Sequence, residues 1–263
     1  MAKPKMIMAA MTRREPPLPW LEPGEPFPDT GQAWGPDAPA PGLLAAGGTL
    51  DTDTLCRAYR AGIFPWFSRG QPILWWSTDP RMVLFPAEFR LHRSLRKTLQ
   101  RFSQDPRCEV RFNSAFDRVI TACAASAREG QDGTWIVPQM VQAYQALHRA
   151  GHAYSVETWI DGELAGGLYG VALGRALFGE SMFTRVPDAS KIALAALVAF
   201  SRAHAIELID CQQNTRHLAS LGAREIPRSD FVARVATHTD QVALDWRFDS
   251  LYWRELLTPQ PTA

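Results

Sequence analysis

The residues best suited to chemistry lie in a short stretch between two helix-like patterns, Ile209-Asp210-Cys211-Gln212. Side chains alternate along an extended strand, so we expect Asp210 and Gln212 to point to one face and Ile209 and Cys211 to the other. A carboxylate beside an amide can recognise or activate an amine. An acidic residue at a strand end is also often a structural cap or turn residue, and this stretch alone leaves both interpretations open.

Size and charge limit what the chain can be. Its 263 residues, 46% of them apolar, suffice for one large domain or for a large domain with a small one. Lys and Arg number 28 against 27 Asp and Glu, which gives a formal net charge of +1. A polyanionic partner would therefore have to meet a local basic patch.

Cysteine spacing and apolar runs indicate a cytosolic protein. The four cysteines are widely separated and form no C-x-x-C pair, which argues against a zinc site and a disulfide scaffold. The apolar run Met6–Met11 is too short for a signal-peptide core, and the longest run, Ile192–Phe200, is far below a membrane span. We therefore expect a reducing compartment and no membrane segment.

The first eighty residues are expected to form a small unit. Nine of the 20 prolines fall between residues 12 and 42, where they disfavour regular structure. Asp51 or Thr52 can cap a helix that ends at Gly62. The aromatic runs 63–67 and 72–76 fit either core packing or a pocket wall. The pattern becomes more regular from about Pro80, which divides the chain into residues 1–80 and 81–263.

A basic helix is predicted at the start of the second unit, over Phe89–Phe102. Its positions 93, 97 and 101 are four residues apart and share one face, with 90 and 96 close by. Like charges at this spacing repel each other unless an anion lies between them. The pattern fits a solvated basic face and a phosphate-binding face equally well.

The remaining pattern predicts an α+β fold. Asp161-Gly162 is a hairpin turn between the alternating strands Ala153–Ile160 and Glu163–Leu173. The other predicted strands are Arg175–Gly179 and Glu207–Gln212, and the predicted helices are Ser114–Ala127, Pro138–Ala150, Ser190–His204 and Thr215–Leu221, with a Gly-rich turn over Gly130–Gly133. This order is similar to the acyltransferase fold of the GNAT superfamily, with a mostly antiparallel sheet flanked by helices.

Coenzyme A is not expected as a cofactor. GNAT acyltransferases hold its pyrophosphate on a glycine-rich turn before the central helix, where backbone N–H groups meet the anion. The corresponding segment here, Thr184–Ser190, has no glycine, carries Asp188, and loses a donor at Pro187.

Several longer motifs resemble the leucyl/phenylalanyl-tRNA–protein transferases. The resemblance runs from about Gly42 to Phe231. Its motifs are Gly62-Ile63-Phe64-Pro65-Trp66-Phe67-Ser68, Ile73-Leu74-Trp75-Trp76-Ser77-Thr78-Asp79-Pro80-Arg81, Gly133-Thr134-Trp135-Ile136, Gly179-Glu180-Ser181-Met182-Phe183, Leu208-Ile209-Asp210-Cys211-Gln212 and Ala219-Ser220-Leu221-Gly222-Ala223.

The resemblance implies transfer of Leu or Phe, and less readily Met, from aminoacyl-tRNA to the α-amine of proteins that begin with Arg or Lys. Such transfer marks the acceptor for bacterial N-terminal-rule degradation. The implied fold is a small N-terminal domain packed on a GNAT-like domain without coenzyme A. Because the aminoacyl ester is already activated, no metal or other cofactor is expected, and nothing in the sequence indicates an obligate oligomer.

The resemblance also implies roles for particular residues. Asp210 and Gln212 would form the catalytic centre, with the carboxylate bonding the amine directly or orienting the Gln212 amide. Glu180 would be the anionic partner of the acceptor, against the alternative of a buried structural carboxylate. The family's apolar donor pocket aligns with Trp66, Trp135, Leu168, Leu177, Phe178 and Met182. Its tRNA-binding stretch aligns with Arg93, Arg96, Lys97 and Arg101.

Three functional classes follow from these patterns. The favoured class is an aminoacyl-tRNA-dependent transferase. An acetyl-CoA-dependent N-acetyltransferase is disfavoured by the missing glycine turn. The third is a binder of aminoacyl-tRNA or of basic N-termini without catalytic activity.

Overall fold

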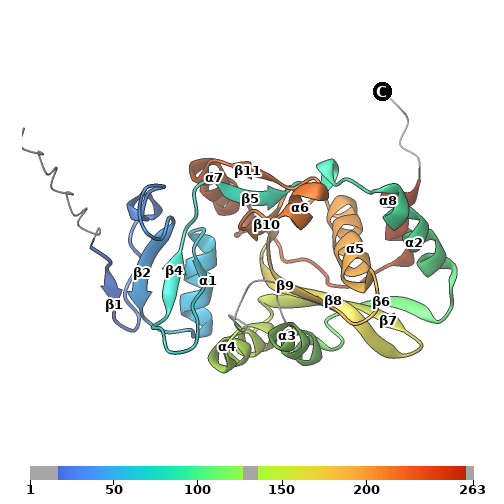
Figure 1. The fold of residues 1–263 in the computed structure, drawn as a ribbon, viewed down its shortest axis with the longest axis horizontal. Helices are drawn as coiled ribbons and strands as arrows, with labels where there is room; N and C mark the ends of the chain where they lie inside the picture. The colour runs from blue at the N-terminus through green and yellow to red at the C-terminus, as the bar shows by residue number, and fades with distance from the viewer. Residues whose placement is uncertain (1–16, 127–135, 259–263) are drawn as a thin grey trace, which may run out of the picture.

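The computed structural model describes residues 17–126 and 136–258, and a small sheet organises the first of them (Figure 1). Its order is β1-β2-β4-β3, with β1 and β2 parallel and the other pairs antiparallel. The four strands are β1 (Trp20–Leu21), β2 (Leu43–Gly47), β3 (Phe64–Pro65) and β4 (Leu74–Trp76). Helix α1 (Thr52–Arg60) packs beside them, and its first turn is capped by Asp51, which accepts the Thr54 N–H at 2.9 Å as predicted.

A seven-stranded sheet organises the rest in the order β11-β5-β10-β9-β8-β7-β6. Neighbouring strands are antiparallel except β9 and β10, which are parallel. The strands are β5 (Arg81–Leu84), β6 (Cys108–Phe112), β7 (Ala153–Ile160), β8 (Glu163–Leu173), β9 (Ala176–Thr184), β10 (Ile209–Gln212) and β11 (Arg224–Ile226).

Helices cover this sheet on both faces, with α5 on one side and α3 and α4 on the other (Figure 1). The helices are α2 (Arg93–Gln104), α3 (Phe116–Ala125), α4 (Pro138–Arg149), α5 (Ala189–Ala203), α6 (Arg216–Ser220), α7 (Arg228–His238) and α8 (Arg254–Leu257), with 3-10 turns η1 (Thr30–Gln32), η2 (Pro86–Glu88) and η3 (Ser250–Trp253). The predicted α+β class, a small N-terminal unit and a mostly antiparallel sheet flanked by helices, is confirmed.

The β7–β8 hairpin begins and ends at the predicted residues. Asp161 and Gly162 both have a positive φ, 52° and 75°. A two-residue turn of this kind matches the twist of the flanking strands, and Asp-Gly adopts it readily. The local sequence is therefore sufficient to fix the hairpin.

Other elements differ from the prediction. The basic helix α2 begins at Arg93 rather than at residue 89, because Pro86 starts a separate 3-10 turn and His92 takes the position before the helix. Residues 42–48 were expected only to lead into a helix, but they contain strand β2. Strands β6 and β11 and helix α7 were not predicted. The Gly-rich turn expected at 130–133 lies outside the described residues.

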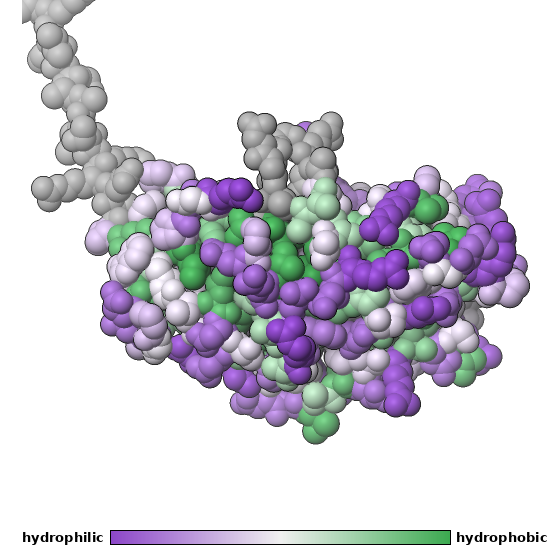
Figure 2. Space-filling model, turned by 90° about the horizontal axis from the view of Figure 1, so that it is seen from below, coloured by the Kyte–Doolittle hydropathy of each residue, from purple (hydrophilic) through white to green (hydrophobic). Residues whose placement is uncertain are grey.

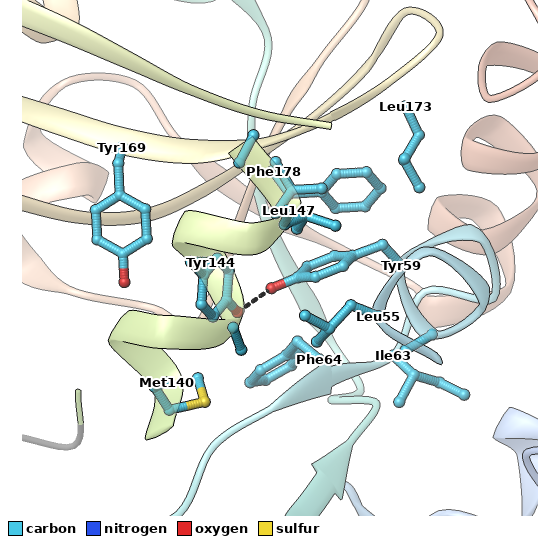
Figure 3. Packing of buried hydrophobic residues seen from close by; sticks show 14 of the residues in the cluster. Leu55, Tyr59, Ile63, Phe64, Met140, Tyr144, Leu147, Tyr169, Leu173 and Phe178 are labelled. Atoms are coloured by element: carbon cyan, nitrogen blue, oxygen red, sulfur yellow. Dashed lines mark hydrogen bonds between the residues drawn. The ribbon is translucent and has the colours of Figure 1, made fainter. Parts of the chain in front are cut away.

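Two apolar cores lie on opposite faces of the seven-stranded sheet. The first core joins α1, α3, α4 and the small sheet, and includes Tyr59, Tyr144 and Phe178 (Figure 3). The second core lies on the other face beneath α5 and α2, and includes Leu168 and Leu177. The first core contains residues from both sides of position 80. The division of the chain into domains 1–80 and 81–263 stays a prediction.

The face seen from below mixes hydrophilic residues with smaller apolar groups (Figure 2). Large apolar side chains are exposed at four positions of the described chain, Trp20, Val186, Val242 and Leu251. Within residues 17–126 and 136–258, no helix is both long and apolar enough to span a membrane.

Candidate active site

Glu180 lies at a bulge in β9. Tyr169 of β8 is the partner of Ser181, and Gly170 is the partner of Gly179, so Glu180 is an extra residue in its strand. Bulges turn side chains out of the regular alternation and are frequent beside active sites. Here the Glu180 side chain meets residues of α1, α4 and β10.

Three uncharged donors hold the Glu180 carboxylate. Tyr59 Oη donates to Oε1 at 2.7 Å, and Gln212 Nε2 donates to the same oxygen at 2.8 Å. Tyr144 Oη donates to Oε2 at 3.1 Å. The hydroxyl oxygens of Tyr59 and Tyr144 also lie within hydrogen-bond distance of each other (Figure 3). Each hydroxyl has one proton, so a hydroxyl that donates to the other tyrosine does not donate to Glu180 at the same time. A carboxylate has about four acceptor positions, so these three donors leave one position, on Oε2, unfilled by the described residues.

This environment raises the pKa of Glu180 to about 7. Burial is the largest cause and the charge of Asp210 adds to it, while the hydrogen bonds from Tyr59, Tyr144 and Gln212 lower the pKa. Burial, followed by the charge of Glu180, raises the pKa of both tyrosines well above 10, so they remain donors at neutral pH. Glu180 itself is half-buried, and it can still be reached from solvent.

Asp210 is fully buried and paired with a cation. Arg81 Nε donates to Oδ1 at 2.8 Å, and Arg81 Nη2 donates to Oδ2 at 2.6 Å. The side chains of both residues are closed to solvent. A bidentate pair of this kind fixes the orientation of the carboxylate as well as its position.

Gln212 lies in a strained turn at the end of β10. Its φ is +60°, and the N–H of Gln213 donates to the carbonyl of Cys211 at 2.7 Å. A positive φ within such a three-residue turn is rare and strained. Asp210 Oδ1 accepts the N–H of Gln212 at 2.9 Å, so a hydrogen-bonded chain runs from Arg81 through Asp210 and Gln212 to Glu180.

Family models match two segments of the chain. The N-terminal domain of the leucyl/phenylalanyl-tRNA protein transferases matches residues 48–79, and the leucyl/phenylalanyl-tRNA protein transferase model matches residues 83–236. The chain belongs to the leucyl/phenylalanyl-tRNA protein transferase family. It is therefore a transferase, and the resemblance predicted from its motifs is confirmed.

Relatives match nearly the whole chain. The leucyl/phenylalanyl-tRNA–protein transferase of a Polaromonas species is 63% identical over 244 residues, 93% of this chain and 96% of the relative. That of Albidiferax ferrireducens is 62% identical over 250 residues, 95% of this chain and 98% of the relative. Among solved structures, a GCN5-related N-acetyltransferase from Kribbella flavida matches with a TM-score of 0.32 and 12% identity, over 64% of this chain and 58% of that chain.

The structure brings together the three residues expected to form the centre of this transferase. Asp210, Gln212 and Glu180 are linked by hydrogen bonds. Ile209 and Cys211 pack on the second core, on the side away from Asp210, as alternation predicts. A bulge interrupts that alternation, however, because Asp210 is the partner of Val83 and Gln212 is the partner of Met82. Of the two roles expected for Asp210, orienting Gln212 fits a buried carboxylate, although the bond goes to its backbone N–H.

The residues expected to form the donor pocket do not form one wall. Phe178 is buried in the first core, against the ring of Tyr59 at 5.0 Å between centroids, and Trp66 packs on that core. Leu168 and Leu177 are buried in the second core, and Met182 packs against it. Trp135 lies outside the described residues. The pocket formed by these six residues stays a prediction.

The aromatic runs before residue 80 contribute mainly to core packing. Phe64, Phe67 and Trp75 are buried in the first core. Trp66 and Trp76 are half-buried, with 5.4 Å between ring centroids. Core packing therefore describes the buried aromatic side chains of these runs. Of the aromatic residues in the runs, Trp66 and Trp76 are the ones exposed enough to contact a ligand as well.

Helix α2 carries the four basic residues expected to bind tRNA, at the opposite end of the molecule from α1 and α4 (Figure 1). Arg93, Lys97 and Arg101 are exposed. Arg96 is half-buried and donates to the carbonyls of Leu256 and Leu257 at 2.9 and 3.3 Å. In this structure Arg96 therefore attaches α8 to α2.

Four residues of the site were given no role from the sequence. Thr78, whose hydroxyl donates to the Gln212 carbonyl, and Arg81 lie within motifs quoted above. The charge of Arg81 directly before the apolar run 82–84 is a signal that could have indicated a role for it. Tyr59 and Tyr144 resemble ordinary apolar positions of their helices. Only their position against Glu180 distinguishes them.

No metal site accompanies this cluster. In the part of the chain that the structure describes, no group of three or more His, Cys, Asp or Glu side chains could hold a metal ion. The four cysteines form no disulfide with one another.

Proposed function

We propose that the protein transfers Leu or Phe, and less readily Met, from aminoacyl-tRNA to the N-terminal α-amine of proteins that begin with Arg or Lys. In bacteria this transfer marks the acceptor for N-terminal-rule degradation. The observation that carries the proposal is the Glu180 carboxylate, half-buried and held by Tyr59, Tyr144 and Gln212 with one acceptor position remaining. We further propose that the protein acts as a monomer in the cytoplasm, where charged tRNA is found.

Glu180 suits the recognition of a basic acceptor. Its pKa of about 7 means that it is ionised in a substantial fraction of molecules at neutral pH. A guanidinium or ammonium that takes the position at Oε2 would form a charge-assisted bond, worth about 1.5–3 kcal/mol. The cation would in turn favour the ionised form of Glu180. An acceptor with an uncharged first side chain gains neither effect.

The transfer itself needs little further activation. The amine nitrogen attacks the ester carbonyl carbon, the new C–N bond forms, and the C–O bond to the tRNA ribose breaks, so that a ribose hydroxyl and an amide result. An α-amine with a pKa near 8 is roughly one-tenth neutral at pH 7. In this proposal Gln212 orients the amine or the carbonyl, and alignment of reacting groups supplies several kcal/mol.

The two ends of the donor substrate have separate partners in this proposal. The donor side chain would contact Trp66 and Met182, the half-buried members of the predicted pocket, and a shaped pocket there would reject β-branched Ile and Val by about 1–3 kcal/mol. The tRNA backbone is held by Arg93, Lys97 and Arg101 of α2, with Arg96 supporting the helix. Phosphate contacts of this kind read charge rather than sequence, and they weaken as salt rises.

Labelled donors test the activity. The protein is incubated with radiolabelled Leu-tRNA, and separately with labelled acetyl-CoA, and with peptides that begin with Arg, Lys or Gly. Label is expected from Leu-tRNA on the Arg and Lys peptides alone. Label from acetyl-CoA would make the protein an acetyltransferase, and binding of Leu-tRNA without incorporation would make it a binder without catalytic activity.

A charge reversal tests the tRNA surface. In the triple variant Arg93→Glu, Lys97→Glu, Arg101→Glu, we expect the KM for Leu-tRNA to rise at least about tenfold, and the salt dependence of that KM to weaken. Transfer from a minimal aminoacyl-adenosine should stay within twofold. Arg118→Glu changes an exposed arginine of α3 and serves as the control. Equal losses on both donors would contradict the assignment of this surface to tRNA.

A further inference from the structure

Arg81 has no access to solvent and makes more contacts than the ion pair requires. Its guanidinium carbon lies 4.7 Å from the ring centre of Phe64 and 4.5 Å from that of Phe231. Its remaining nitrogen, Nη1, donates to the carbonyl of Gly62 at 3.3 Å. Arg81 therefore connects the segment that follows α1 with helix α7 and strand β10.

Asp210, the ion-pair partner of Arg81, is not accessible to a substrate. Asp210 is closed to solvent, and its oxygens accept from the guanidinium and from the N–H of Gln212. The effect of this carboxylate is therefore exerted on the backbone of Gln212. Because that backbone is in a strained turn, the surrounding contacts must hold it there.

Besides the Gln213 N–H bond to the Cys211 carbonyl, three contacts among the described residues hold the turn. Asp210 takes the N–H of Gln212, Thr78 Oγ1 donates to its carbonyl at 3.1 Å, and Glu180 accepts from its amide at 2.8 Å. Two of the three contacts reach the backbone directly. Without them, Gln212 would relax toward an ordinary extended conformation, which would turn its side chain away from Glu180.

We propose that Arg81 is a positioning residue for the transfer reaction, acting through Asp210 to keep Gln212 in its strained turn and its amide on Glu180. This inference rests on the proposed function. In this arrangement the Arg81–Asp210 ion pair fixes the position of Gln212. Of these three residues, Gln212 is the one that contacts the reacting groups. The inference predicts that weakening the pair slows turnover while leaving substrate binding intact.

The test substitutes the arginine conservatively. Arg81→Lys keeps the charge but loses the bidentate fork. The matched control is Arg202→Lys, because Arg202 also makes three hydrogen bonds through its guanidinium, in its case to the backbone carbonyls of Pro86, Ala87 and Glu255. The measurements are kcat and KM for Leu-tRNA and for an Arg-starting peptide, and the hydrogen-exchange rate of the Gln212 amide by NMR.

We expect kcat to fall about 10- to 100-fold in Arg81→Lys, since a small displacement of an aligned group can cost as much as 100-fold. Both KM values should stay within about twofold, and exchange of the Gln212 amide should accelerate. Arg202→Lys should change neither kcat nor that exchange rate. A folded Arg81→Lys protein with wild-type kcat, or with unchanged exchange at Gln212, overturns the inference.

A second variant covers the case in which Arg81→Lys does not fold. Thr78→Val removes the donor to the Gln212 carbonyl at constant shape, and we expect kcat to fall about threefold or more with faster exchange at Gln212. Thr158→Val is its control, because Thr158 donates to the carbonyl of Ala189 at 2.8 Å and has no role in the site. Wild-type values in Thr78→Val overturn the claim that the held turn matters. An inactive wild-type protein instead contradicts the proposed function, while the exchange data still report on the turn.

Discussion

The two carboxylates of the site, Glu180 and Asp210, have opposite surroundings. Glu180 is half-buried, accepts from two hydroxyls and an amide, and has its pKa raised to about 7. Asp210 is fully buried and receives a bidentate guanidinium, itself packed against two aromatic rings. Neutral donors leave a carboxylate able to change its charge and to accept a ligand cation, whereas a buried arginine fixes it in place.

This contrast separates a residue that meets substrate from one that shapes the site. Glu180 is the carboxylate on which pH and acceptor identity should act. Asp210 is the carboxylate on which stability and the conformation of Gln212 should depend. Substitutions at Glu180 should therefore change acceptor use and pH dependence, and substitutions at Asp210 should change stability and turnover.

The largest effect is expected from Asp210→Ala. The substitution leaves Arg81 charged, buried and unpaired, which costs about 3–5 kcal/mol in the free energy of unfolding. Turnover should fall much more than binding of Leu-tRNA, because Gln212 loses its support. Urea unfolding and steady-state kinetics measure the two effects. Asp53→Ala, at an exposed ion pair with Arg57, should change stability by no more than about 0.5 kcal/mol. A stable Asp210→Ala variant with near wild-type kcat would remove the distinction between the carboxylates.

Glu180→Gln should act on the acceptor rather than on stability. The substitution keeps the shape and removes the charge, so kcat/KM for an Arg-starting peptide should fall about 10- to 100-fold, the value of one charge-assisted bond. Glu163→Gln, at an exposed glutamate, is the control and should match wild type. If Glu180→Gln used Arg and Gly peptides as the wild type does, Glu180 would be a structural carboxylate.

The raised pKa of Glu180 predicts a smaller effect with a definite sign. Transfer to Arg-starting peptides should rise as Glu180 ionises, so the rate ratio of wild type to Glu180→Gln should increase about fivefold between pH 6 and pH 7. The acceptor amine titrates equally in both proteins and cancels in this ratio. A ratio that does not vary between pH 5.5 and 8 would contradict the raised pKa.

The same shift affects stability in the opposite direction. The pKa in the folded state is raised from 4.5 to about 7, so the protonated carboxyl stabilises the fold. Its contribution is complete below pH 4.5 and is lost as pH rises through 7. Urea unfolding of wild type against Glu180→Gln over this range should show the difference.

The smallest effect is expected from Tyr59→Phe. Its hydroxyl donates to Glu180 and thereby lowers the pKa of that carboxyl, so its loss should move the midpoint of the acid limb upward by roughly one unit. At pH 8 the rate should differ from wild type by only a few-fold. Tyr252→Phe, which removes a hydroxyl that bonds His204 at 3.1 Å, serves as the control. A midpoint that moves downward would contradict the direction of the hydrogen bond.

The sequence by itself determined the elements whose signals are local. Alternation and the Asp161-Gly162 turn fixed the β7–β8 hairpin, and Pro138 fixed the start of α4, because each depends on conformational preferences of neighbouring residues. The sequence also predicted that Asp210 and Gln212 lie at the end of one strand, and the motifs identified the family.

Only the tertiary structure decided how the two carboxylates differ. Arg81 and Asp210 are 129 residues apart, and Tyr59 and Tyr144 are 85 residues apart, so no local pattern links either pair. The bulges at Glu180 and Cys211 depend on pairing with β8 and β5, which sets the register of each strand. The charge state of a carboxylate depends on the atoms that surround it, and packing of distant segments brings those atoms together.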